Sequence, residues 1–223
     1  MINIYPTNLS ATLDATAETF FYQKSIPAQQ REDTASLIIS RQNRSGANSG
    51  FFIPFAAETE TQPRLFTGEP LHTDFAYRHI QLIECARILI LLGLDTPPIC
   101  NSISCAEQRM AASCYSKFCS KGECKVLTLA YMRYVNISAL QDSEPHLAYF
   151  LSRLADFRDG KGKWSNFPYY YTLLILSELD DPLANEELKY AAPTCEKLLN
   201  HIEPSDHFSK RRHLILTNIL SRN

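Results

Sequence analysis

Residues 157–171 read FRDGKGKWSNFPYYY and carry the clearest boundary between two helices in the chain. Two glycines stop the preceding helical pattern, the only tryptophan follows at Trp164, and Asn166 with Pro168 marks the start of a new apolar helix. A weaker copy of this pattern occupies residues 41–52, again after a helical segment. Two such boundaries predict helical hairpins that stack on one another.

Helical periodicity recurs through most of the chain, and no segment shows convincing strand-like alternation of apolar and polar residues. The pattern predicts an all-α fold of about nine helices. Most of them are joined by short loops and are therefore expected to be antiparallel to their neighbours. Residues 43–71, which contain three prolines, predict a long irregular connection. Because no break in composition divides the 223 residues, a single domain, 1–223, is expected.

Several helix ends can be assigned from capping residues. Ser10 and Asn166 are expected to cap the helices that follow them, and Asp181 to begin a helix that Pro193 kinks. One continuous helix is expected to end near Gly122, because an apolar stripe runs through Ala106, Met110, Cys114 and Phe118.

The charge and hydropathy patterns limit which partners and which cellular compartment are expected. A formal net charge of −2 gives no overall positive field, so no nucleic-acid partner is expected. The longest basic run, residues 210–213, is interpreted as a solvated helix face. Residues 80–94 are the most apolar segment but include charges and are shorter than the roughly 20 residues of a membrane span. Residues 1–8 lack the pattern of a secretion signal, which favours a cytoplasmic protein.

Two segments resemble a known repeat unit, in which a helix is followed by a glutamine, a glycine-rich turn and an aromatic residue. The first is ASLIISRQN at residues 35–43 with Gly46, Gly50 and Phe51, and the second is residues 151–164 followed by FPYYY. This unit is similar to the repeats of prenyltransferases and squalene cyclases. The resemblance implies an α/α toroid, here partial or opened into a solenoid, and suggests an enzyme acting on an isoprenoid substrate. The acidic motif and the zinc-ligand set of those enzymes are not found.

Five of the seven cysteines fall within residues 100–124. Their spacing differs from the paired Cys-x-x-Cys of zinc ribbons, and small core residues are the favoured interpretation. A redox disulfide and a metal site are the alternatives. The metal site would use Cys114, Cys119 and Cys124, because Gly122 turns the chain between the last two, and would hold zinc or an iron–sulfur cluster.

The aromatic residues after the glycine turn form the second candidate site. Three consecutive tyrosines span about 200° of a helix, so they cannot all face one core. At least one ring is therefore expected to face a groove, a cavity or a neighbouring helix. The ligand-binding residues inferred on this basis are Trp164, Phe167, Tyr169 and Tyr170. The competing interpretation is that these rings wedge one hairpin against the next.

Local signatures of catalysis are not evident in the sequence. The six histidines form no metal-binding pair, and a nucleophile elbow, a phosphate loop and a dinucleotide fingerprint are all missing. The catalytic residues of any enzyme activity are therefore unknown. Residues 64–69, within the long connection, are interpreted as a cap over the first hairpin or as a binding loop.

The leading functional hypothesis is a non-catalytic binding or scaffold domain. Its concave, aromatic-lined face would hold an apolar small molecule or a partner peptide. The alternatives are the isoprenoid enzyme that the resemblance suggests and a cysteine-based metal or redox site. A homodimer is a further hypothesis, because the first and last helices are rather apolar for the exposed ends of an open array.

Overall fold

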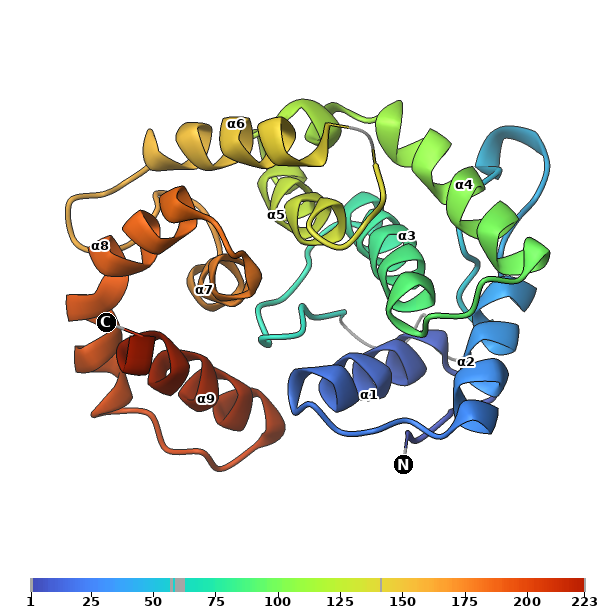
Figure 1. Ribbon diagram of the computed structural model, residues 1–223, viewed down its shortest axis with the longest axis horizontal. Coiled ribbons are helices and arrows are strands. Elements are labelled where there is room, and N and C mark those ends of the chain that lie inside the picture. The colour runs from blue at the N-terminus through green and yellow to red at the C-terminus, as the bar shows by residue number, and fades with distance from the viewer. Residues whose placement is uncertain (1, 57, 59–62, 141, 223) are drawn as a thin grey trace. The chain divides into compact units, whose positions relative to one another are not determined.

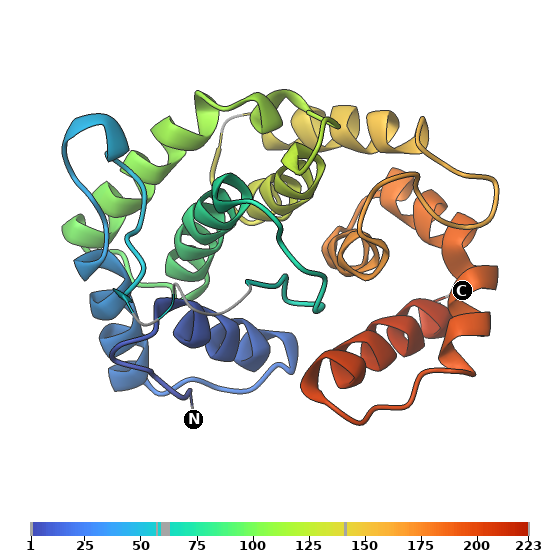
Figure 2. The same ribbon diagram turned by 180° about the vertical axis from the view of Figure 1, so that it is seen from behind.

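The computed structural model describes residues 2–56, 58, 63–140 and 142–222, and within them the chain is all-α, as the sequence predicts. Figures 1 and 2 show the helices from opposite sides. In the described residues β-pairing is confined to three isolated bridges. The α-helices there are α1 (Leu9–Phe21), α2 (Ala28–Ser40), α3 (Asp74–Leu91), α4 (Pro97–Ala111), α5 (Cys124–Val135), α6 (Ser143–Ala155), α7 (Tyr169–Glu178), α8 (Pro182–Leu199) and α9 (His207–Arg222).

The chain divides into two compact units. The first comprises Met1–Pro63 and Leu71–Cys119, and it contains α1 to α4. The second comprises Arg64–Pro70 and Ser120–Asn223, and it contains α5 to α9. The segment 64–70 therefore packs with helices that follow it by more than 50 residues.

Helix α3 is the core of the first unit. It contacts α1, α2 and α4, and it is buried on nearly every face between Ala76 and Leu89. Its sequence explains this position, because apolar residues surround almost the whole circumference and leave no face suited to water. Thr73 begins the helix by accepting a hydrogen bond from the backbone N–H of Ala76.

Helix α7 has the same role in the second unit. Residues 171–176 are consecutively buried, and the helix contacts α5, α8 and α9. Helix α8 packs against α6, α7 and α9. As predicted, Asp181 caps α8, accepting from the N–H of Leu183, and Pro193 lies inside the helix.

Two helices start differently from the prediction. Asn8, not Ser10, caps α1, and the N–H groups of Leu9 and Ser10 donate to the carboxylate of Glu58 at 2.8 Å. Asn166 does not cap α7, because it adopts a left-handed conformation and the helix begins after Pro168.

In place of Asn166, a glutamate from segment 64–70 accepts a hydrogen bond from the first turn of α7. The N–H of Tyr171, in the first turn, donates to Glu69 Oε1 at 3.2 Å. In α1 and α7 alike, a glutamate far along the chain binds N–H groups that a helix start leaves without intrahelical partners.

The prediction of one continuous helix that ends near Gly122 is wrong, because α4 ends at Ala111. A short 3₁₀ helix, η3 (Cys114–Lys117), follows it. The hydroxyls of Ser113 and Ser116 donate to backbone carbonyls of the preceding turn, and such bonds compete with the helical ladder. Phe118 then adopts a positive φ of 61°, which a helix cannot contain.

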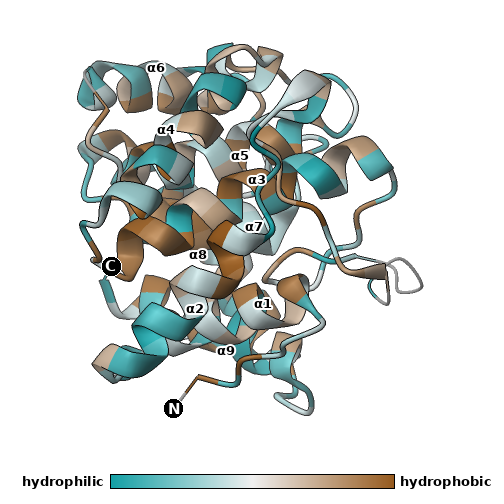
Figure 3. Cartoon of the chain, turned by 90° about the vertical axis from the view of Figure 1, so that its right-hand side faces the viewer, coloured by the Kyte–Doolittle hydropathy of each residue, from teal (hydrophilic) through white to brown (hydrophobic). Residues whose placement is uncertain are grey.

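Most helices carry both hydrophilic and hydrophobic residues on the side that Figure 3 shows. Among the described residues no helix is both long enough and apolar enough to cross a bilayer.

Candidate functional site

A short hairpin, residues 157–165, follows α6 in the second unit. Arg158 and Trp164 form an isolated antiparallel bridge, and the N–H of Asp159 donates to the carbonyl of Lys163 at 2.9 Å. Gly160 and Gly162 both adopt φ values near the left-handed region, at 76° and 80°. The glycine turn that the sequence marks as a helix stop is thus a closed hairpin.

One carboxylate of helix α8 binds both residues of this bridge. The indole N–H of Trp164 donates to Glu187 Oε2 at 2.7 Å, and Nη2 of Arg158 lies 2.7 Å from Oε1. Glu187 and Trp164 are both buried. Gly162 lies so close to Thr194 that a Cβ atom would be only 2.5 Å from its Oγ1. The Thr194 hydroxyl also donates to the carbonyl of Lys161 at 2.7 Å, and the Tyr190 hydroxyl accepts from the N–H of Gly160 at 2.8 Å. Several polar bonds and one close approach therefore fix the hairpin on α8.

The four aromatic residues predicted to bind a ligand differ in accessibility. Trp164 and Phe167 are 3% and 7% exposed, and the ring of Phe167 packs edge-on against Phe157. Tyr169 and Tyr170 are half-buried, with their ring centroids 5.5 Å apart. Trp164 and Phe167 thus pack in the interior of the second unit, and Tyr169 and Tyr170 keep part of their surface in solvent.

Two cations lie against the rings of these tyrosines. Nζ of Lys163 is 5.2 Å from the centroid of Tyr169, and the guanidinium carbon of Arg212 is 4.7 Å from that of Tyr170. Burial, followed by contacts with the Cys195 thiol, raises the pKa of the Tyr169 hydroxyl. Burial also raises the pKa of Tyr170. Both tyrosines therefore stay neutral at physiological pH.

The basic run at residues 210–213 is not a solvated face, so that prediction is wrong. Arg211 is 1% exposed and donates to the carbonyl of Phe66 at 2.9 Å, while Arg212 donates to that of Thr67 at 2.6 Å. Leu65 and Phe66 are buried. Segment 64–70 is thus held on α9, within the second unit.

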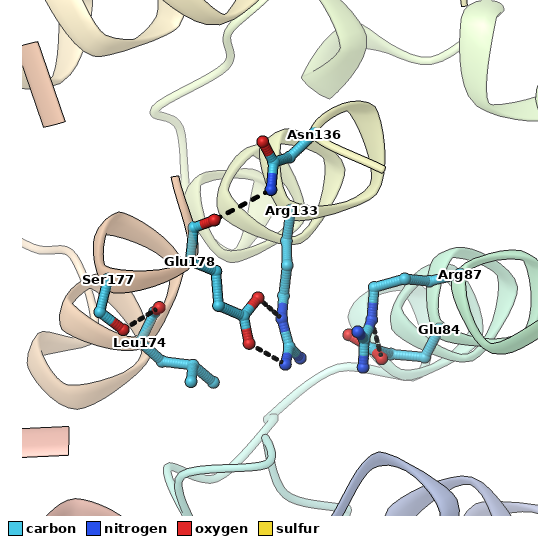
Figure 4. A network of polar contacts seen from close by, with 7 residues as sticks. All are labelled: Glu84, Arg87, Arg133, Asn136, Leu174, Ser177 and Glu178. Atoms are coloured by element: carbon cyan, nitrogen blue, oxygen red, sulfur yellow. Dashed lines mark hydrogen bonds and ion pairs between the residues drawn. The ribbon is translucent and has the colours of Figure 1, made fainter. Parts of the chain in front are cut away.

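A second ionic contact joins α5 to the end of α7 (Figure 4). Arg133 binds both oxygens of Glu178 at 2.6 Å, and the Asn136 amide donates to the Glu178 carbonyl at 3.1 Å. In the first unit the guanidinium of Arg87 contacts the carboxylate of Glu84, one turn earlier on α3, at 2.8 Å. These pairs fix the end of α7 against α5 and one face of α3.

The cysteines differ from the core interpretation that the sequence favoured. Of the five in residues 100–124, Cys100 and Cys114 are exposed and the other three are partly exposed, so core packing is wrong for this group. Cys85 and Cys195, outside the group, are the buried ones. Three thiols of the group come together, since the Sγ atoms of Cys114, Cys119 and Cys124 all lie within 4.8 Å of one another.

Sequence reasoning missed a buried histidine in the first unit. Nδ1 of His79 lies 3.1 Å from the hydroxyl of Tyr115, and the Phe51 ring packs edge-on against the imidazole. Burial, and then the charges of Arg109 and Arg78, lowers the pKa of His79 to about 4. The position of His79 within an apolar helical pattern was the available signal, because a histidine there must find a polar partner.

Comparisons of the chain with protein-family models, with curated proteins and with solved structures found no match.

Proposed function

We propose that the chain is a non-catalytic helical-repeat binding domain, and that the exposed surface of Tyr169 and Tyr170 binds a partner peptide. The observation that carries the proposal is the arrangement of these two neighbouring rings, each half-buried and each beside a cation. Rigid rings with a polar tip are common at protein interfaces because they bury a large area with little loss of side-chain freedom.

The helical-repeat part of the proposal is supported by matching packing in the two units. In the first unit α1 contacts α2 and α3, and α4 contacts the same two helices, which also contact each other. The contacts of α1 and of α4 recur four steps later in helix order, since α5 contacts α6 and α7, and α8 contacts α6 and α7. A duplicated unit explains this agreement, and it is the pattern that stacked helical hairpins share.

The hairpins at equivalent places give the same support. Residues Gln42 and Phe52 form a bridge after α2, as Arg158 and Trp164 do after α6. The amide of Gln42 donates to the carbonyl of Ser102 on α4 at 2.8 Å, in the way that Trp164 donates to α8. The helix followed by such a hairpin is the sequence pattern that resembles toroid repeats. We therefore propose that the helices form a partial toroid or an open solenoid.

Charge selects the kind of peptide. Lys163 is exposed, and Arg212 lies beside Tyr170 with one nitrogen bound to the carbonyl of Thr67. The nearby carboxylate of Asp159 already accepts hydrogen bonds from the backbone N–H groups of Lys161 and Lys163. A peptide with an apolar side chain next to an acidic one therefore suits this surface, because the acidic group can meet the cations.

The test is selection of binding peptides from a random displayed library against the purified chain. Enrichment of an aromatic or aliphatic residue next to Asp or Glu is expected. The selected peptide should bind Tyr170→Ser at least about tenfold more weakly than the wild type. This change equals a loss of about 1.4 kcal/mol in binding free energy, which is typical of a central contact residue. Tyr149→Ser is the matched control, since Tyr149 is a 50% exposed tyrosine on α6 of the same unit.

Two results would overturn the proposed surface. One is equal affinity of the selected peptides for the wild type and for Tyr170→Ser. The other is binding of an apolar anionic dye, monitored by fluorescence and lost in Tyr170→Ser, without any selected peptide, which would favour a small apolar ligand instead. Circular dichroism of each variant separates a lost contact from a lost fold.

A further inference from the structure

We propose that Cys114, Cys119 and Cys124 form a three-thiolate binding site for one Zn²⁺ ion, with the fourth ligand supplied from solvent. The site is independent of the aromatic surface. Its geometric basis is that all three Sγ atoms lie within 4.8 Å of one another. In a tetrahedral zinc site, Zn–S bonds of about 2.3 Å place two sulfurs about 3.8 Å apart. Each sulfur pair therefore has to close by at most about 1 Å, which small side-chain rotations provide.

The local backbone brings the three thiols together. They fall within eleven consecutive residues, 114–124, so the conformation of this stretch alone sets their separation. The chain reverses twice in it, at Phe118 with φ 61° and at Gly122 with φ 50°. Short-range hydrogen bonds close both turns, from the N–H of Phe118 to the carbonyl of Tyr115 and from that of Cys124 to Lys121.

The two turns divide the stretch into three parts, and each part carries one cysteine. Cys114 is the first residue of η3, Cys119 lies between the turns, and Cys124 is the first residue of α5. Cys124 lies at the start of a 12-residue helix, where the backbone N–H groups and the helix dipole favour a negatively charged group such as a zinc–thiolate centre.

The surrounding charges suit an anionic metal centre. Three thiolates on Zn²⁺ carry a net charge of −1. Lys117, Lys121 and Lys125 lie in or directly after the same stretch, and Glu123 is its one acidic residue. The excess of positive side chains lowers the energy of the anionic centre, while a site with four thiolates would add a further negative charge.

The number and exposure of the thiols distinguish zinc from the alternatives. An iron–sulfur cluster takes four cysteines, and the group in the described residues that could hold a metal contains three. Cys114 is exposed and the other two are partly exposed, so water can reach the fourth position of the metal. Zinc with three protein ligands and an open position is a known arrangement, and it leaves the ion able to bind an incoming ligand.

The first experiment is a metal titration of the full chain without an affinity tag. The protein is reduced under anaerobic conditions, stripped with a chelator and titrated with Zn²⁺ against a chromophoric competitor. One equivalent is expected to bind to the wild type. Cys119→Ser should bind at least about 100-fold more weakly, since even second-shell changes weaken metal sites by about 10–100-fold.

Matched controls lie on α4. Cys100→Ser replaces an exposed cysteine and Cys105→Ser a partly exposed one, and neither belongs to the group of three. Both variants should keep one equivalent of zinc with wild-type affinity. Equal affinity in Cys119→Ser and the wild type, or no zinc uptake by the reduced wild type, would overturn the proposal.

A second measurement does not depend on the variants folding. Alkylation of the wild type, followed by peptide mass spectrometry, reports each cysteine separately. Zinc should slow the modification of Cys114, Cys119 and Cys124 and leave Cys100 unchanged. Equal protection of Cys100, or a disulfide within the group that forms in place of zinc binding, would contradict the assigned ligands.

Discussion

The indole nitrogen of Trp164 and the carboxylate of Glu187 form a 2.7 Å hydrogen bond between two buried side chains. The same carboxylate binds the guanidinium of Arg158. One glutamate on α8 therefore binds both residues of the Arg158–Trp164 bridge, and together with Tyr190 and Thr194 it fixes the position of the hairpin on that helix.

Removing this carboxylate should destabilise the second unit. Glu187→Ala leaves the buried indole N–H without an acceptor, and we expect the free energy of unfolding to fall by about 2 kcal/mol. Arg158 contributes little to the loss, because it is partly exposed and can turn to water. Urea denaturation of Glu187→Ala and of the control Glu186→Ala, an exposed neighbour, measures the effect. A change within about 0.5 kcal/mol for both variants would contradict it.

Glu58 should make the stability of the first unit depend on acid pH. Burial alone would raise the pKa of this carboxyl, but hydrogen bonds, chiefly from backbone N–H groups, outweigh it and lower the pKa from 4.5. A lowered carboxyl pKa stabilises the folded state above the unfolded pKa, and this contribution is lost as the pH falls through the folded pKa.

The variant Glu58→Gln isolates this contribution. The wild type should be more stable than Glu58→Gln above about pH 5.5, and the difference should shrink steadily below about pH 4.5. Urea denaturation at several pH values measures it, with Glu32→Gln on the exposed face of α2 as the control. A stability difference independent of pH would show that Glu58 does not act through its charge.

The sequence predicts helices well where their signals are local. The cap of α8 at Asp181 lies next to its helix, and the buried character of α3 follows from its own periodicity. Glu58 and Glu69 are different, because they bind helix starts 49 and 102 residues away along the chain. Capping rules compare residues within one turn, so they assigned these tasks to Ser10 and Asn166.

The candidate sites follow the same rule, because their local signals are visible in the sequence and their long-range contacts are not. The sequence grouped Cys114, Cys119 and Cys124 because Gly122 indicated one turn. It gave no signal for the other turn, since Phe118 has a positive φ that residues other than glycine rarely adopt. Trp164 was identified as a special residue, but its buried bond depends on Glu187, which lies 23 residues further along.

His79 should add pH dependence in a different range. Its pKa of about 4 lies below the ordinary 6.5, because burial comes first and the charges of Arg109 and Arg78 follow. The unfolded chain therefore binds a proton that the folded chain does not, and stability falls as the pH drops from 6.5 to about 4. This shift corresponds to about 3 kcal/mol in total.

An NMR titration of the imidazole measures this pKa directly. We expect a value near 4 in the wild type and a higher one in Arg109→Gln, which removes one of the two charges. His201→Gln, which replaces an exposed histidine at the end of α8, provides a comparison spectrum for assigning signals. A pKa near 6.5 for His79 would contradict the electrostatic account.

The glycines of the hairpin in the second unit should differ in their tolerance of alanine. Gly160 and Gly162 both have positive φ, which costs an alanine about 1 kcal/mol at either position. A Cβ at Gly160 meets nothing within 4 Å, whereas one at Gly162 meets Thr194. Gly162→Ala should therefore lose about 1–3 kcal/mol more in unfolding free energy than Gly160→Ala. Equal losses would show that the hairpin can move away from α8 without cost.

The hairpin of the first unit offers the same pair of positions, which tests whether the two units share one design. A Cβ at Gly50 would lie 2.8 Å from the carbonyl of Cys105 on α4, and one at Gly46 meets nothing within 4 Å. If the units are copies of one repeat, Gly50→Ala should lose more unfolding free energy than Gly46→Ala. The difference should again be about 1–3 kcal/mol, close to the one found in the second unit. Hydrogen exchange of α4 reports the same event locally, because a displaced hairpin exposes that helix. A large margin in the second unit with none in the first would separate the two hairpins physically and remove their support for a repeat.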